Sequence, residues 1–173
     1  TCPRLSVMVT SFSISDDAAE MYLLFKTVYP DLILPSRKVQ WEAAIKANAD
    51  DIDAGDGAKF RAAVPGTSWV NADMRWVAAM RYSYEILGTQ RYLDDYNGGM
   101  NLVAGSLLPD GAYLYDGMQN DVYTYHGAII ESLGRVWQIT GDIRAKNMIV
   151  GSYWYYPMSA EPNGTPEYSS GAA

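Results

Sequence analysis

The residues that could carry chemistry concentrate between Asn120 and His126. This stretch holds an amide side chain, tyrosines at positions 123 and 125, and the only histidine of the sequence. Histidine titrates near neutral pH and can accept a proton, and a tyrosine hydroxyl can donate one. An amide can stabilise a developing negative charge by hydrogen bonding. We therefore predict a site for general acid–base catalysis formed by Asn120, Tyr123, Tyr125 and His126.

Aromatic residues surround this stretch. The sequence contains 14 Tyr and 5 Trp but only 3 Phe, and Tyr and Trp combine a flat apolar face with a polar group. Such side chains suit the stacking and hydrogen bonding that a sugar needs, although a Tyr-rich helical core would explain the composition equally well. Tyr113 and Tyr115 are predicted to act as sugar platforms at the rim of the site. Asp116, Arg135 and Trp137 complete the predicted substrate-binding set.

The composition excludes several other classes. The net charge is −7 and no cluster of Lys and Arg exists, which argues against a nucleic-acid partner. No apolar run approaches the roughly 18 residues that span a bilayer, so no membrane partner is expected. The single cysteine, Cys2, predicts neither a disulfide within the chain nor a metal site. The acidic segment 50–57 is predicted to be a solvated loop, since it lacks the Glu that closes a calcium loop.

Apolar residues recur at helical spacing along most of the chain, so the domain is predicted to be all-α. A short β-like run at 5–10 precedes the first helix. Gly98 and Gly99 predict a bend or a break within one helix. The helices are expected at about 15–28, 36–50, 58–64, 71–87, 89–107, 127–140 and 142–155.

One segment occurs twice in related form. Tyr84–Arg91 and Trp137–Arg144 align at an offset of 53 residues, with an aromatic residue, Ile, Gly, a capping residue and Arg in matching places. Repeated units of this size are typical of stacked helix hairpins. We predict a single helical domain over residues 1–173, built of antiparallel helix hairpins. Its expected buried set is Val77, Tyr84, Ile130, Leu133 and Trp137.

The hairpins are followed by Asp110-Gly111-Ala112-Tyr113 and a polar aromatic loop that ends in His126-Gly127-Ala128. This arrangement resembles the (α/α) toroid catalytic domain of polysaccharide lyases, in the hyaluronate, chondroitin and xanthan lyase group or the heparinase II/III-like group. The resemblance covers about residues 70–156. It implies an incomplete toroid, whose partner would be the remainder of its own toroid or another chain. Because half a toroid cannot close its ring, at least two helices should expose apolar faces.

The resemblance also implies a function. The protein would be a secreted or periplasmic polysaccharide lyase that cleaves a uronate-containing polysaccharide by β-elimination, with no metal or cofactor. Asn120 would neutralise the uronate carboxylate, His126 would take the C5 proton, and Tyr123 or Tyr125 would protonate the leaving oxygen. A His126→Ala variant is then expected to remain folded and to lose turnover by a factor on the order of 10² to 10⁴.

Two alternatives stay open. A toroid glycoside hydrolase would use two carboxylates, with Asp110, Asp116 and Asp121 as candidates and Asp94-Asp95 less suitable, because adjacent helical residues diverge. A non-catalytic carbohydrate-binding helical fragment would use the aromatic residues alone. Helical arginines such as Arg135 have an alternative role of their own, namely pairing with Asp or Glu on neighbouring helices.

Overall fold

A computed structural model describes residues 8–114 and 123–165, and within these residues the chain forms helices and no β-strand. The predicted all-α class is confirmed. The elements are α1 (Met8–Val28), η1 (Pro30–Leu32), α2 (Pro35–Ile52), η2 (Asp53–Gly57), α3 (Ala58–Ala62), α4 (Val70–Leu87), α5 (Gln90–Ser106), α6 (Tyr123–Thr140), α7 (Ile143–Gly151) and α8 (Tyr155–Met158).

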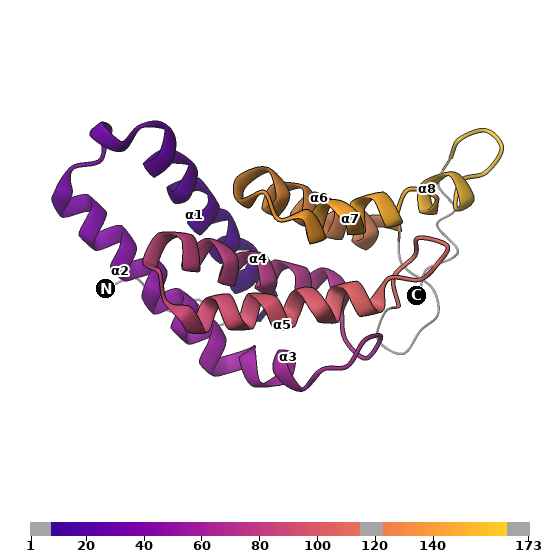
Figure 1. Ribbon diagram of the computed structural model, residues 1–173, viewed down its shortest axis with the longest axis horizontal. Coiled ribbons are helices and arrows are strands. Elements are labelled where there is room, and N and C mark those ends of the chain that lie inside the picture. Colours follow the sequence, from indigo (N-terminus) through magenta and orange to yellow (C-terminus); the bar gives the residue numbers. More distant parts are fainter. Residues whose placement is uncertain (1–7, 115–122, 166–173) are drawn as a thin grey trace.

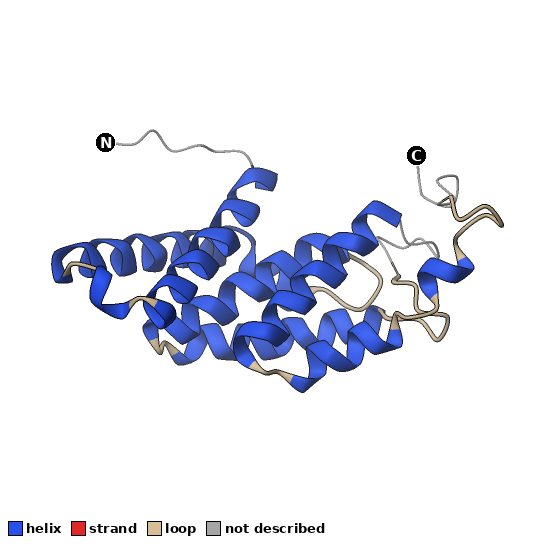
Figure 2. Ribbon diagram, turned by 90° about the horizontal axis from the view of Figure 1, so that it is seen from above, coloured by secondary structure: helices blue, strands red, loops and turns tan. Residues whose placement is uncertain are grey.

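Three helix hairpins make up the domain: α1 with α2, α4 with α5, and α6 with α7 (Figure 1). Helix α4 is the central element, since it contacts α1, α2, α5 and α6. Its inward residues Met74, Val77 and Met80 are fully buried, as expected for a helix that has neighbours on several sides. The array of helices is elongated, with the α1–α2 hairpin towards one end and α8 at the other (Figure 1 and Figure 2).

The two related segments of the sequence form the same turn. Gly88 ends α4 with φ of 67° and donates its N–H to the carbonyl of Tyr84 at 2.7 Å. Gly141 follows α6 with φ of 70° and donates to the carbonyl of Trp137 at 2.8 Å. Glycine adopts this left-handed conformation without the steric penalty that a Cβ atom brings. The 53-residue repeat is therefore a structural repeat at its turns.

Asp142 begins α7 as predicted, and it also joins two hairpins. Its carboxylate accepts the N–H of Arg144 at 2.8 Å, which caps the helix. The same carboxylate accepts the hydroxyl of the buried Tyr96 on α5 at 2.5 Å. Burial and the hydrogen bond to Asp142 raise the pKa of Tyr96, so the phenol stays protonated and keeps donating.

Several predicted boundaries are wrong. Residues 8–10 begin α1 instead of forming a strand, and the acidic segment 50–57 continues α2 into a π-helical turn. Gly98 and Gly99 do not break α5. Gly99 serves packing, since a Cβ atom there would collide with Val77 of α4. The missing side chain at this position lets α4 and α5 approach closely.

The predicted buried set is partly correct. Val77 and Leu133 are fully buried, whereas Tyr84 and Ile130 are half-buried. Trp137 is 39% exposed, so its predicted burial is wrong. The buried stripe of α6 runs through His126, Ile129, Leu133 and Val136, which turns Trp137 towards the edge of the helix, where the Lys146 ammonium lies 5.4 Å from its ring centroid.

Helices α1 and α2 expose apolar side chains, as the resemblance to half a toroid predicts. Met21 is 67% exposed and Phe25 39% on α1, and Val39 is 69% exposed and Trp41 42% on α2. Met21, Phe25 and Trp41 line an open groove of about 390 Å³ between these helices. An exposed apolar surface of this kind is typical of a face that contacts another surface.

Candidate functional site

The described residues on either side of the predicted loop lie at one end of the helical array, drawn at right in Figure 1. The start of α4, the end of α5, the start of α6 and α8 all lie there. After α5 the chain forms a tight hairpin, in which Leu114 donates its N–H to the carbonyl of Ser106 at 2.8 Å. Asp110 accepts the N–H of Ala112 at 3.1 Å, and Gly111 follows it with φ of 91°. Asp110 thus stabilises the turn, and this bond engages one of its two carboxylate oxygens.

His126 lies in the core of this end. Its exposed fraction is 0%, and its ring stacks on Tyr155 with centroids 3.9 Å apart and planes inclined by 15°. Tyr113 and Tyr156 contact the imidazole at centroid distances of 5.5 and 5.1 Å. Tyr113 is itself fully buried. His126 was predicted to lie in the catalytic site and Tyr113 to be a sugar platform at its rim. Both rings instead fill the core between the hairpin, α6 and α8.

Two exposed aromatic side chains lie at the same end of the array. Trp69, the residue before α4, is 52% exposed, and Tyr125 in the first turn of α6 is 37% exposed. Their ring centroids lie 6.4 Å apart, with the ring planes inclined by 32°. We call these two residues the aromatic pair. Such side chains offer an apolar face for stacking together with polar groups for hydrogen bonds.

A cavity of about 560 Å³ lies beside the aromatic pair, and we call it the Asp73 cavity. Trp69, Ser68, Lys59 and Asp73 line it. Asp73 is 1% exposed, and its carboxylate accepts a hydrogen bond from the Ser68 hydroxyl through Oδ2. Its other oxygen, Oδ1, is buried and has no hydrogen-bond partner among the described residues.

Asp73 has the electrostatic properties of a proton-transfer group. Burial raises the pKa of its carboxyl to about 6, and the hydrogen bond from Ser68 only partly offsets that effect. A buried carboxyl that titrates near neutral pH can exist in both protonation states under working conditions. The cavity therefore combines an aromatic surface, the cation of Lys59 and a carboxyl suited to donating or accepting a proton.

The remaining predicted residues fall into two groups. Tyr115, Asp116 and Asn120 lie outside the described residues, and Tyr123 is the first residue of α6, with its side chain outside the described part. Arg135 and Trp137 follow His126 by nine and eleven residues, which places them more than about 13 Å further along the helix. The structure thus brings Tyr113, Tyr125 and His126 to one end and leaves Arg135 and Trp137 elsewhere.

Arg135 has the alternative role that the sequence left open. Its guanidinium pairs with Glu20 at 3.0 Å and Asp17 at 3.1 Å on α1, and with Glu131 at 2.6 Å on its own helix. Arg75 likewise pairs with Asp16 of α1 at 2.9 Å. These ion pairs hold α1 against α4 and α6, so both arginines are engaged in packing the helices together.

Trp69 and Asp73 were not predicted from the sequence. The signal was present in Pro65-Gly66-Thr67-Ser68-Trp69, a turn rich in polar residues directly before a helix. Loops on a rigid scaffold often carry binding residues. Gly66 has φ of 80°, and a Cβ atom there would lie 3.0 Å from Leu114. This close approach places the loop before α4 against the hairpin after α5.

Comparisons with models of known protein families, with curated proteins and with solved structures found no match for this chain. Within the described residues, no three His, Cys, Asp or Glu side chains group in a way that could hold a metal ion. None of the described helices is long and apolar enough to cross a membrane.

Proposed function

We propose that this protein binds a uronate-containing polysaccharide at the aromatic pair and the Asp73 cavity, as part of a secreted or periplasmic polysaccharide lyase with an (α/α) toroid fold. The observation that carries the proposal is the pairing of exposed Trp69 and Tyr125, together with the cavity that Trp69 lines along with Lys59 and Asp73. The aromatic rings supply a stacking surface for a sugar chain. Lys59 supplies a positive charge for the carboxylate of a uronate.

The proposed reaction is β-elimination, in which the Tyr125 oxygen takes the C5 proton and then gives a proton to the glycosidic oxygen, as the C4–O bond breaks and the C4–C5 double bond forms. His126 was predicted to be the base, but its ring is packed among three tyrosines and does not line the Asp73 cavity. Tyr125, one residue earlier in the sequence, has an exposed side chain and belongs to the aromatic pair. Asn120, in the segment that leads into α6, keeps its proposed role of neutralising the uronate carboxylate by hydrogen bonding.

Absorbance near 232 nm tests the elimination, because the reaction creates a conjugated double bond. The protein is incubated with a panel of uronate polysaccharides, and reducing ends are measured in parallel. Rising absorbance that a Tyr125→Phe variant abolishes would support the proposal. Retention of full activity in that variant would remove Tyr125 from the mechanism.

Glycoside hydrolysis is the second candidate, and Asp73 is the observation that favours it. A general acid in a hydrolase needs a carboxyl with a raised pKa, and burial raises the pKa of Asp73 to about 6. Release of reducing ends without absorbance at 232 nm, lost in an Asp73→Asn variant, would support hydrolysis over elimination. Binding without either product would leave the carbohydrate-binding function alone.

A further inference from the structure

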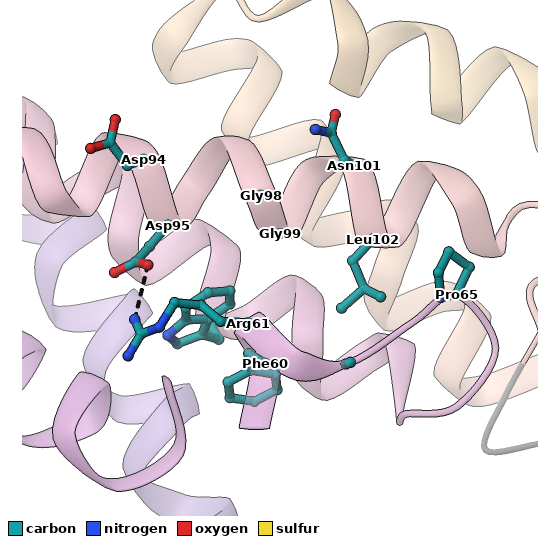
Figure 3. Close-up of a pocket in the computed structure, with 11 residues that line it drawn as sticks. Phe60, Arg61, Pro65, Asp94, Asp95, Gly98, Gly99, Asn101 and Leu102 are labelled. Atoms are coloured by element: carbon teal, nitrogen blue, oxygen red, sulfur yellow. Dashed lines mark hydrogen bonds and ion pairs between the residues drawn. The ribbon is translucent and has the colours of Figure 1, made fainter. Parts of the chain in front are cut away.

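A second cavity is lined in part by the segment between α3 and α4, which also lines the Asp73 cavity. It has a volume of about 480 Å³ and is formed by α3, α4, α5 and the segment that follows α3. This volume falls within the roughly 300–1,000 Å³ of small-molecule sites. We call it the Asp95 cavity (Figure 3). Phe60 and Ala63 line both this cavity and the Asp73 cavity, so the two adjoin.

Two buried polar atoms of the Asp95 cavity lack hydrogen-bond partners among the described residues. One is Oδ2 of Asp95, an acceptor on a residue that is 6% exposed, and the other is Nε1 of Trp76, a donor on a residue that is 1% exposed. Both residues line the cavity. Buried polar groups without partners are costly, so these atoms favour a ligand that supplies one donor and one acceptor.

The charges of the cavity select the kind of ligand. Arg61 and Asp95 point towards one another in Figure 3, with Nη1 of Arg61 2.9 Å from Oδ1 of Asp95. The same guanidinium nitrogen also contacts Asp53 at 2.5 Å, so two carboxylates already neutralise the cation. Asp94 adds a further carboxylate to the lining. The excess of negative charge disfavours a uronate here.

A neutral sugar meets these requirements better than an amine does. Each hydroxyl group can both donate to a carboxylate and accept from an indole N–H, whereas an ammonium group can only donate. The apolar side chains of Phe60, Pro65 and Leu102 also line the cavity, and they match the C–H faces of a sugar ring. We propose that the Asp95 cavity binds a neutral sugar residue of the same polysaccharide whose uronate residue occupies the Asp73 cavity, an inference that rests on the function proposed above. The substrate is then a mixed polysaccharide, in which neutral sugars accompany the uronate.

Binding of three oligosaccharides tests this proposal by isothermal titration calorimetry. The probes are xylotetraose, xylotetraose that carries one glucuronate, and tetragalacturonate. The variant is Gly98→Phe, because Gly98 lines the cavity and a Cβ atom there meets no other atom within 4 Å. The matched control is Gly134→Phe, since Gly134 of α6 also has open space around its Cβ position and lines neither cavity. A cooperative thermal unfolding transition in each variant would show that both are folded.

We expect the glucuronate-bearing probe to bind most tightly, and we expect Gly98→Phe to weaken it at least roughly tenfold while Gly134→Phe leaves it unchanged. An Asp95→Asn variant, which keeps the shape of the side chain, should weaken the same probe. Equal binding of the mixed probe by wild type and Gly98→Phe would overturn the inference and leave the proposed function intact. Binding of xylotetraose that Gly98→Phe abolishes, with no added affinity from glucuronate, would support the neutral site and contradict the proposed function. Absence of binding by all three probes would overturn both.

Discussion

The imidazole of His126 stacks on the phenol ring of Tyr155 with centroids 3.9 Å apart, so the only histidine of the sequence is a core residue. Tyr113 packs against the same imidazole. The contact joins the start of α6 to α8 and to the hairpin after α5. His126 therefore fixes the position of the neighbouring Tyr125, which presents its ring to solvent.

We expect His126→Ala to lower the free energy of unfolding by on the order of 3 kcal/mol, because it removes a buried ring and leaves a cavity. His126→Phe keeps a ring of similar size and should be much less destabilised. Urea unfolding monitored by circular dichroism measures both. If His126→Ala were as stable as the wild type, the described packing would be wrong. Loss of all turnover in a folded His126→Phe variant would instead support the predicted proton-transfer role of the imidazole.

The aromatic pair should dominate polysaccharide binding. Trp69→Ala should raise the Kd for an acidic polysaccharide roughly tenfold or more, since large exposed aromatic residues often carry a disproportionate share of binding energy. Trp41→Ala is the matched control, because Trp41 is similarly exposed on α2 and lines neither of the two adjoining cavities. Affinity electrophoresis in gels that contain the polysaccharide provides the measurement. Equal retardation of the two variants would contradict the assignment of the site.

Asp73 should make stability depend on pH. The folded state holds the Asp73 proton up to a pKa of about 6, against 3.8 for an unperturbed Asp. Its stabilising contribution is therefore complete below the unfolded pKa and is lost as pH rises through the folded pKa. Two pKa units correspond to roughly 3 kcal/mol.

We expect the wild type to lose on the order of 3 kcal/mol relative to Asp73→Asn between about pH 4 and pH 7. Urea unfolding of both proteins across this range provides the test. Asp16, whose pKa burial also raises to about 6, is present in both proteins, so its contribution cancels in the difference. Parallel stability curves would show that Asp73 titrates as an ordinary carboxyl.

The two repeat turns should respond alike to substitution. Gly88→Ala and Gly141→Ala should each destabilise the protein by about 1–2 kcal/mol, since both residues have positive φ and alanine is strained there. Gly134→Ala is the control, because this glycine lies inside α6 with space around its Cβ position. That change should be neutral or stabilising. A smaller loss at the turns than at the control position would contradict the repeat.

The sequence by itself determined the features that depend on neighbouring residues. Helical periodicity located the hairpins, and Gly88, Gly141 and Asp142 marked helix ends, because a positive φ and a capping carboxylate act within a few residues. In each of these cases the controlling interactions lie close together along the chain.

The tertiary structure decided which face of each helix is buried and which loops meet. The stripe of α6 runs through His126, Ile129 and Leu133, whereas the sequence pattern favoured Ile130 and Trp137. A small rotation about the helix axis separates the two choices, and only the packing against α4, α7 and α8 fixes it. Trp69 and Tyr125 are far apart in the sequence, and they become neighbours because α4 and α6 begin at the same end of the array. Contacts of this kind leave no local pattern in the sequence.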